Sequence, residues 1–417
     1  MKKILALVLA LCMVFALCAC GQSAAPAATE APAAAEEPAA EAPAEETPAE
    51  ETEYKVAMIT DYGDITDQSF NQTTYEACKA FAEDNGIEFN YFKPAGDSTA
   101  DRVAMIEKAV DEGYNVIVMP GYAFGGAIVE AAPEFPEVKF IALDVAKGDL
   151  LETAVANAGE TYDYNPDNWD FEQYVDMSNV YCAIYQEELC GYMAGYAAVK
   201  LGYKNLGFLG GMAVPAVTRY GYGFVQGVDA AAAELGLTDV TLNYVYGGQF
   251  KGDADITAVM DTWYSNGTEV VFACGGGIYV SACEAAQKVG GKVIGVDVDQ
   301  SGIIDGAYGE GMTVTSAMKG LYPATYDTLT DVIINGNWAN YVGKIENLGL
   351  VSGDDPEANY VQIPMTTQFE DGKFTADDYK ALVASMFDGT ITVSNDTSKA
   401  ASDFATVITV NDQGSIK

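Results

Sequence analysis

From Lys55 onward, short apolar runs alternate with amphipathic stretches, and this alternation constrains the fold more than any other feature of the sequence. Strand–helix–strand units of this size predict a parallel sheet with helices on its faces, an α/β fold. The first predicted strands are Lys55–Thr60, Ile87–Phe92, Val116–Pro120 and Lys139–Leu143. The helices expected between them, from their apolar spacing, are Tyr75–Asn85, Ala100–Glu112 and Phe124–Ala132.

A second series of the same kind begins at Asn179 and predicts a second lobe. Its expected strands are Asn179–Tyr185, Asn205–Leu209, Val240–Tyr246, Glu269–Ala273, Lys292–Val296 and Met312–Thr315. Its expected helices are Glu187–Leu201, Val217–Leu235, Asp253–Asn266, Ile278–Val289, Leu321–Ile334 and Ala376–Phe387. Between the two series, the polar segment Leu150–Met177 predicts a long surface insertion that could lie over a cleft.

Acidic residues and glycines directly follow many of the predicted strands. Asp61, Asp144 and Asp297 each come after a strand, and Gly275 begins a run of three glycines after another. For any one of them taken alone, a helix N-cap or a tight turn is the better explanation. Because parallel strands bring their carboxyl ends to one sheet edge, the joint placement predicts a ligand site there.

The loop Thr60–Gln72 follows the first strand and is the most polar of these connections. It contains acids, amides and aromatic residues, among them Phe70 and Asn71, but no Lys or Arg. This composition favours a neutral or cationic ligand with a flat ring over a phosphate, which would require a Gly-rich turn or cations. Phe70 could equally be a core anchor at the start of the next helix.

The amino end has the pattern of a secreted lipoprotein. Two lysines precede the apolar stretch Ile4–Ala19, which is shorter than the roughly 20 residues of a membrane-spanning helix. The stretch ends in Leu-Cys-Ala-Cys, similar to a bacterial lipobox, so we expect residues 1–19 to be a signal peptide and Cys20 to be lipidated. The alternative is an ordinary cleaved signal with Cys20 free. Residues 20–53 are mostly Ala, Pro and Glu and predict a disordered tether.

Charge and composition narrow the function classes. A formal net charge of −40 makes nucleic acid an unsuitable partner. The chain has no histidine, which excludes Ser-His-Asp and Cys-His catalysis and most zinc sites, although not carboxylate-based hydrolysis. We therefore expect no metal, no cofactor and a small-molecule ligand.

Cysteines follow Cys20 at five positions, each inside an apolar helix or strand pattern: Cys78, Cys182, Cys190, Cys274 and Cys283. The odd number and the absence of a Cys-x-x-Cys motif predict buried free thiols that act as small apolar side chains. A Cys182–Cys190 disulfide is the alternative.

Several motifs, in order, resemble those of the BMP family, the basic membrane lipoproteins that serve as substrate-binding proteins of ABC transporters. The motifs are TDYGDITDQSFNQ at 60–72, DEGYNVIV at 111–118, FLGGM at 208–212, ACGGG at 273–277, VIGVDVDQ at 293–300 and TSAMK at 315–319. The resemblance implies a two-lobed periplasmic-binding-protein fold of type I, with a mostly parallel sheet flanked by helices in each lobe and a ligand cleft between the lobes. We expect the first lobe over residues 54–182, the second over 183–297, and a return to the first lobe plus a C-terminal extension over 298–417.

The same resemblance implies an extracytoplasmic lipoprotein of a bacterial cell membrane that captures a nucleoside, most often a purine nucleoside, for an ABC permease. It implies a binding protein and not an enzyme. In the family, Phe70 would stack on the base, Asp61 and Asn71 would bind its edge, Asp297 would accept the ribose hydroxyls, and Lys319 would bond the sugar or pair with Asp297.

Two further family positions have less defined roles. Asp144 would lie against the base or close the cleft, and Gly275 would let the backbone approach the ligand. Three alternative functions remain at this point: binding of another small molecule such as riboflavin, sensing for a membrane kinase, and nucleoside hydrolysis by Asp61 and Asp144.

Overall fold

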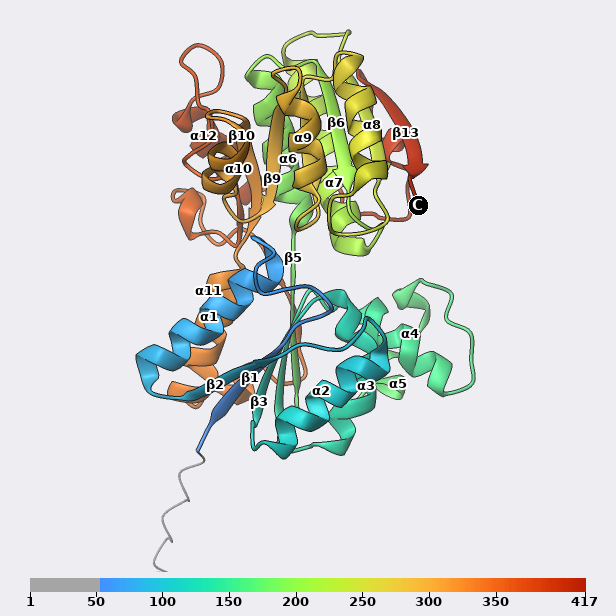
Figure 1. Cartoon of the computed structure of the whole chain (residues 1–417), viewed down its shortest axis with the longest axis vertical. Helices are drawn as coiled ribbons and strands as arrows, with labels where there is room; N and C mark the ends of the chain where they lie inside the picture. Colours follow the sequence, from blue (N-terminus) through green and yellow to red (C-terminus); the bar gives the residue numbers. More distant parts are fainter. Residues whose placement is uncertain (1–52) are drawn as a thin grey trace, which may run out of the picture. The chain divides into compact units, whose positions relative to one another are not determined.

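A computed structural model describes residues 53–417, which form two sheets with helices on their faces (Figure 1). The six-stranded sheet, sheet A, has the order β11-β5-β4-β3-β1-β2, and its strands run parallel. These strands are β1 Lys55–Ile59, β2 Glu88–Phe92, β3 Val116–Pro120, β4 Lys139–Leu143, β5 Val180–Tyr185 and β11 Ile345–Leu348.

The seven-stranded sheet, sheet B, has the order β12-β10-β9-β8-β6-β7-β13, and only β12 runs antiparallel to its neighbour. Its strands are β6 Asn205–Gly210, β7 Thr241–Tyr246, β8 Val270–Cys274, β9 Lys292–Asp297, β10 Thr313–Lys319, β12 Val361–Gln362 and β13 Thr409–Ser415. The predicted α/β class and both predicted series of strands are confirmed, with small shifts at strand ends.

Helices connect most of the strands. They are α1 Phe70–Asn85, α2 Thr99–Asp111, α3 Gly125–Ala131, α4 Lys147–Asn157, α5 Phe171–Tyr174, α6 Glu187–Lys200, α7 Pro215–Glu234, α8 Ala254–Ser265, α9 Tyr279–Gln287, α10 Ser301–Tyr308, α11 Leu321–Leu329 and α12 Ala376–Phe387. In β8, Val270 and Phe272 join the apolar core shared with α6 and α7, whereas Val271 and Ala273 join the core beneath α8 and α9. Successive strand residues point to opposite faces, so a strand covered on both faces is a continuous apolar run.

The chain passes between the two sheets at three places. β5 of sheet A leads through Gln186 into α6, which packs against β10 of sheet B. β10 leads through Gly320 into α11, which packs against α1, and β11 of sheet A is followed by β12 of sheet B. Glu187 and Lys319 therefore lie at the first two of these crossovers.

Sheet membership differs from the expected division over residues 298–417. This segment is expected to return to the first lobe and to end in a C-terminal extension. Instead, β10, β12 and β13 pair within sheet B, and only β11 pairs within sheet A. Similarly, β5 continues in sheet A to Tyr185, beyond the expected boundary at 182. The neighbour that a strand chooses depends on tertiary packing, which local propensity does not encode.

The segment Leu150–Met177, expected to be a long surface insertion, contains ordered elements that pack beside sheet A. Its first part is helix α4, and Tyr162, Val175 and Met177 pack into the same core as α4. The carboxylate of Asp163 accepts hydrogen bonds from side chains of the polar stretch, including Nε1 of Trp169 at 2.8 Å. The apolar residues of Leu150–Met177 are too widely spaced to give the periodic pattern of a helix or strand. They nevertheless anchor the segment beside sheet A.

The last part of the chain wraps around sheet B, and we call residues 361–417 the C-terminal strap. β12 pairs with β10 at one edge, α12 packs against α6, and β13 pairs with β7 at the opposite edge. Asp229 on α7 fixes the approach to β13, because its carboxylate accepts the backbone N–H groups of Thr406 and Val407 at 2.8 Å and of Ile408 at 3.2 Å.

The predicted signal peptide, the lipid anchor on Cys20 and nearly all of the tether lie outside the described residues. Within residues 53–417, no helix is long and apolar enough to cross a membrane.

The five cysteines of the described chain are free and buried, as predicted. Cys182 and Cys190 therefore do not form the alternative disulfide. Burial raises the pKa of each of these thiols, so they act as small apolar side chains and not as thiolates.

Candidate functional site

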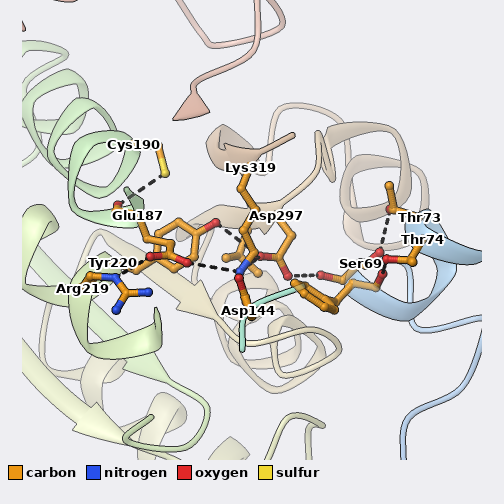
Figure 2. Close-up of polar contacts among 12 residues, drawn as sticks. Ser69, Thr73, Thr74, Asp144, Glu187, Cys190, Arg219, Tyr220, Asp297 and Lys319 are labelled. Atoms are coloured by element: carbon orange, nitrogen blue, oxygen red, sulfur yellow. Dashed lines mark hydrogen bonds and ion pairs between the residues drawn. The ribbon is translucent and has the colours of Figure 1, made fainter. Parts of the chain in front are cut away.

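The ammonium group of Lys319 lies at the centre of a buried cluster of charged side chains (Figure 2). Lys319 ends β10, and its Nζ contacts the carboxylate of Asp144, the residue directly after β4. Nζ also lies 3.7 Å from Oδ1 of Asp297, which ends β9, and 3.6 Å from Oε1 of Glu187, which begins α6. Lys319 thus joins carboxylates at the strand ends of both sheets.

Burial makes these charges depend on one another. The side chains of Lys319 and Glu187 are 3% and 0% exposed, and those of Asp144 and Asp297 are 9% and 8% exposed. Burial by itself lowers the pKa of Lys319, but the combined effect of the three carboxylates, which raises it, is larger. The pKa therefore lies above its usual range, and the ammonium stays charged. Removing one partner would leave a poorly compensated charge in the interior.

Asp144 has an unusual environment for a carboxylate. Burial raises its pKa to about 6, and the adjacent Lys319 only partly opposes this shift. Within residues 53–417, its Oδ1 is buried without a hydrogen-bond partner. A buried unsatisfied acceptor costs about 1–3 kcal/mol. A ligand that places a hydrogen-bond donor against this oxygen would remove that cost.

The backbone at the site is also unusual. Asp144 and Asp297 adopt left-handed conformations, with φ of 59° and 65°. Among non-glycine residues of the described chain, only Gln68 and Tyr164 also have positive φ. Such conformations cost of order 1 kcal/mol or more for residues other than glycine, and they concentrate at functional sites. Three of the four lie at or beside the cluster around Lys319.

Aromatic rings surround the Lys319 ammonium. Its Nζ lies 4.7 Å from the ring centroid of Phe70, 5.4 Å from that of Tyr185 and 5.5 Å from that of Tyr220, all within cation–π range. Phe70, the first residue of α1, also packs against the apolar core. The ring of Phe70 therefore contacts the core and also lies beside the charged cluster.

The loop before α1 forms one hydrogen bond to the end of β9 and one to the connection that follows β9. The hydroxyl of Ser69 donates to Oδ2 of Asp297 at 2.5 Å, and Nε2 of Gln300 donates to the carbonyl oxygen of Gln68 at 3.2 Å. The hydroxyl of Tyr220 donates to the other oxygen of Asp297 at 3.3 Å. Asp297 is therefore held by donors from the loop before α1 and from helix α7.

Asp61 and Asn71 form a second group within the first loop. Oδ1 of Asp61 accepts the backbone N–H groups of Tyr62 and Gly63, each at 2.6 Å, and Nδ2 of Asn71 at 3.1 Å. Nδ2 of Asn71 also donates to Asp67, which leaves the buried Oδ1 of Asn71 without a partner in the described chain. Asp61 and Asp144 have separate hydrogen-bonding partners in the described structure.

Gly275, by contrast, has Gly211 and Phe250 as its near neighbours and not the side chains around Lys319. A Cβ atom added at Gly275 would lie 3.0 Å from Cα of Gly211 and 3.0 Å from Cδ1 of Phe250. Close packing of these loops therefore explains the glycine. Of the sequence-predicted residues, the structure brings together Phe70, Asp144, Asp297 and Lys319.

Sequence reasoning did not identify Ser69, Tyr220, Glu187 or Arg219. Nε of Arg219 donates to Oε2 of Glu187 at 2.6 Å, and Glu187 faces Lys319 on its other side. The rule that identified Asp61 and Asp144 applies to Glu187 as well, because it follows β5 after one intervening residue. No group of three or more His, Cys, Asp or Glu side chains in residues 53–417 is arranged to hold a metal ion.

Comparison with known families gives one match over most of the chain. A family model described as "ABC transporter substrate-binding protein PnrA-like" matches residues 54–354. The ABC transporter nucleoside-binding protein BmpA of Lactococcus lactis subsp. cremoris is 26% identical over 261 residues, 60% of this chain and 65% of the relative. The match therefore spans less than two thirds of that relative. Basic membrane protein B of Borreliella burgdorferi is 25% identical over 323 residues, 76% of this chain and 82% of the relative.

Solved structures share the fold at low sequence identity. An ABC transporter solute-binding protein from Aeropyrum pernix K1 has a TM-score of 0.58 at 20% identity and covers 84% of this chain and 90% of its own. One from Conexibacter woesei DSM 14684 has a TM-score of 0.56 at 19% identity and covers 82% and 99%. The expected type I periplasmic-binding-protein fold is confirmed.

Proposed function

This chain belongs to the Bmp family of PnrA-like ABC transporter substrate-binding proteins, and on this premise we propose that it captures a nucleoside outside the cytoplasm for uptake by an ABC permease. In this proposal purine nucleosides are the preferred ligands, and a lipid on Cys20 anchors the protein to the cell membrane. The similarity to the Lactococcus relative, which is named as a nucleoside-binding protein, supports the ligand class.

The observation that carries the proposal is the convergence of Asp144, Asp297 and Lys319 at one buried point (Figure 2), with the ring of Phe70 4.7 Å from the Lys319 ammonium. An aromatic face beside paired carboxylates and an ammonium matches the chemistry of a nucleoside. The base offers a flat ring to Phe70, and the ribose diol offers two donors that one carboxylate, Asp297, can accept together. Lys319 supplies a charged donor for a ribose oxygen.

For the remaining residues we propose more limited roles. The unpartnered Oδ1 of Asn71 would accept a hydrogen bond from an N–H group of the base, with Asp61 holding the amide in place. Asp144 would accept a donor through its unpartnered Oδ1. Gly275 packs against Gly211 and Phe250 and not against these side chains, so it is left out of the ligand set.

Calorimetric titration of the purified protein with guanosine, inosine, adenosine, cytidine and riboflavin tests this function. We expect purine nucleosides to bind most tightly and cytidine at least about tenfold more weakly, a difference of about 1.4 kcal/mol. Binding of riboflavin alone would replace the nucleoside proposal with a flavin one. Chromatography of the titrated samples should show intact nucleoside, and release of free base would favour a hydrolase instead.

Transport and anchoring are tested in cells. Deletion of the gene should reduce uptake of the labelled nucleoside, and unchanged uptake would favour the sensor alternative. The Cys20→Ala variant should move from the membrane fraction to the soluble or secreted fraction, whereas retention in the membrane would contradict the lipid anchor.

A further inference from the structure

Glu187 is a fully buried carboxylate between two cations. Its Oε2 accepts a hydrogen bond from Nε of Arg219 at 2.6 Å, and its Oε1 lies 3.6 Å from Nζ of Lys319. The side chains of Glu187 and Arg219 are 0% and 13% exposed. Alternating charges therefore run from α7 through Glu187 to the centre of the candidate site (Figure 2).

This chain of charges also connects two crossovers between the sheets. Glu187 follows Gln186, whose backbone N–H donates to the carbonyl oxygen of Leu348 at 2.9 Å. Lys319 precedes Gly320, whose backbone N–H donates to the carbonyl oxygen of Tyr360 at 2.6 Å. Periplasmic binding proteins close around ligands by hinge motion at such connections. A contact between two crossovers fixes the lysine relative to both sheets.

The electrostatics of the cluster require Glu187. Burial raises the pKa of Asp144 to about 6, so this carboxylate takes up a proton more readily than an exposed aspartate. Asp297 already accepts hydrogen bonds from Ser69 and Tyr220. Oε1 of Glu187 has no hydrogen-bond donor within the described chain, so Lys319 is the cation that this oxygen faces.

We propose that Glu187 and Arg219 form a positioning pair that holds the Lys319 ammonium between Asp144 and Asp297 and thereby determines how strongly the site requires ribose hydroxyls. The pair acts through Lys319 and does not contact the ligand. The inference rests on the proposed nucleoside binding for its second measurement, but its first measurement needs no ligand.

The first measurement compares two consecutive glutamates. Glu188 shares the first turn of α6 with Glu187 and is 3% exposed. Within residues 53–417 it forms no ion pair with Lys319, whose partners are Asp144, Glu187 and Asp297. Each of Glu187→Gln and Glu188→Gln is combined with Lys319→Met, and Tm is measured for single and double variants. The Tm changes relative to wild type should be non-additive for Glu187→Gln and additive for Glu188→Gln. Additive changes for both would overturn the pairing.

The second measurement uses inosine and 2′,3′-dideoxyinosine as probes, and its readout is the ratio of the two dissociation constants. Glu187→Gln should lower the preference for inosine by about tenfold, whereas Glu188→Gln should keep the wild-type ratio. Arg219→Lys, which keeps the charge but loses the planar fork, should give an intermediate ratio. A loss of affinity for both probes with an unchanged ratio would show a merely structural role and overturn the proposal.

The two measurements fail separately. If the wild-type protein binds neither probe, nucleoside capture is contradicted. The Tm comparison of single and double variants, which needs no ligand, then tests the positioning pair by itself. If Glu187→Gln does not fold, Arg219→Gln replaces it in both measurements, because it breaks the same chain of charges at its other end.

Discussion

The hydroxyl of Ser69 donates a hydrogen bond to Oδ2 of Asp297 at 2.5 Å, although 228 residues separate them in the sequence. Ser69 immediately precedes α1, and Asp297 ends β9 of sheet B. The bond therefore ties the start of the helix that carries Phe70 to the carboxylate proposed to read the ribose. A change at Ser69 should be detectable as a change in the binding properties of Asp297.

Ser69→Ala should weaken inosine binding by about tenfold, because a hydrogen bond to a charged group contributes about 1.5 kcal/mol or more. Thr73→Ala is the matched control, since the Thr73 hydroxyl donates only to the carbonyl oxygen of Ser69, at 2.6 Å. Calorimetry should show near-wild-type affinity for the control. Equal losses in the two variants would mean that the start of α1, and not the bond to Asp297, is responsible.

Phe70→Ala should weaken purine nucleoside binding by about tenfold to a hundredfold, because stacking of a base on an aromatic ring contributes about 1–3 kcal/mol. Phe70→Tyr keeps the ring and should retain most of the affinity, and Phe70→Leu keeps apolar volume without the ring. If Phe70→Leu binds as well as wild type, Phe70 serves the core and does not stack on the base. Tm measurements on the same variants separate loss of folding from loss of binding.

Glu188 should make stability depend on pH. Burial raises its pKa from 4.5 to about 7, so the folded chain holds this proton more tightly than the unfolded chain. The resulting stabilisation is fully present below about pH 4.5 and is lost as the pH rises through 7. Glu188→Gln should therefore match wild type near pH 4 and exceed its unfolding free energy by about 1–3 kcal/mol at pH 8.

Urea denaturation at both pH values measures the effect of Glu188→Gln, with the exposed Glu130→Gln as control. A difference from wild type that is the same at pH 4 and pH 8 would show that the proton on Glu188 is not involved.

Asp229→Asn should loosen the C-terminal strap. The carboxylate accepts three backbone N–H groups and the hydroxyl of Thr406 at 2.6 Å, and an amide replaces one accepting oxygen with a donor. We expect a loss of about 2–3 kcal/mol in the free energy of unfolding and faster proteolysis before β13. Nucleoside affinity should not change, and an affinity loss at unchanged stability would connect the strap to the binding site.

Much of the site could be predicted from the sequence because acids after buried strands fall at one edge of a parallel sheet. Asp144 and Asp297 were identified in this way, whereas Glu187 has the same position after β5 and was not. An acid at the start of a helix is already explained by the helix dipole, so Glu187 gave no separate signal. Ser69 and Arg219 act through contacts between distant segments, which no local pattern encodes.

The elements of the fold also differ in how well the sequence predicts them. Strands such as β8 are continuous apolar runs and could be predicted with nearly correct ends. β12 and β13 are short or polar, and their pairing with β10 and β7 depends on packing of the C-terminal strap. For Leu150–Met177, the polar composition indicated a surface insertion, but not the few separated apolar residues that anchor it.

The position of β13 has a consequence for the behaviour of many copies at high concentration. Without β13, the edge of sheet B would be β7, whose sequence Thr-Leu-Asn-Tyr-Val-Tyr is rich in residues that favour strand addition. β13 occupies that edge with a mostly exposed strand that contains Asn411, Asp412 and Gly414. A charged, polar edge is a poor template for a strand from another molecule, so the strap should also protect the protein against edge-to-edge aggregation.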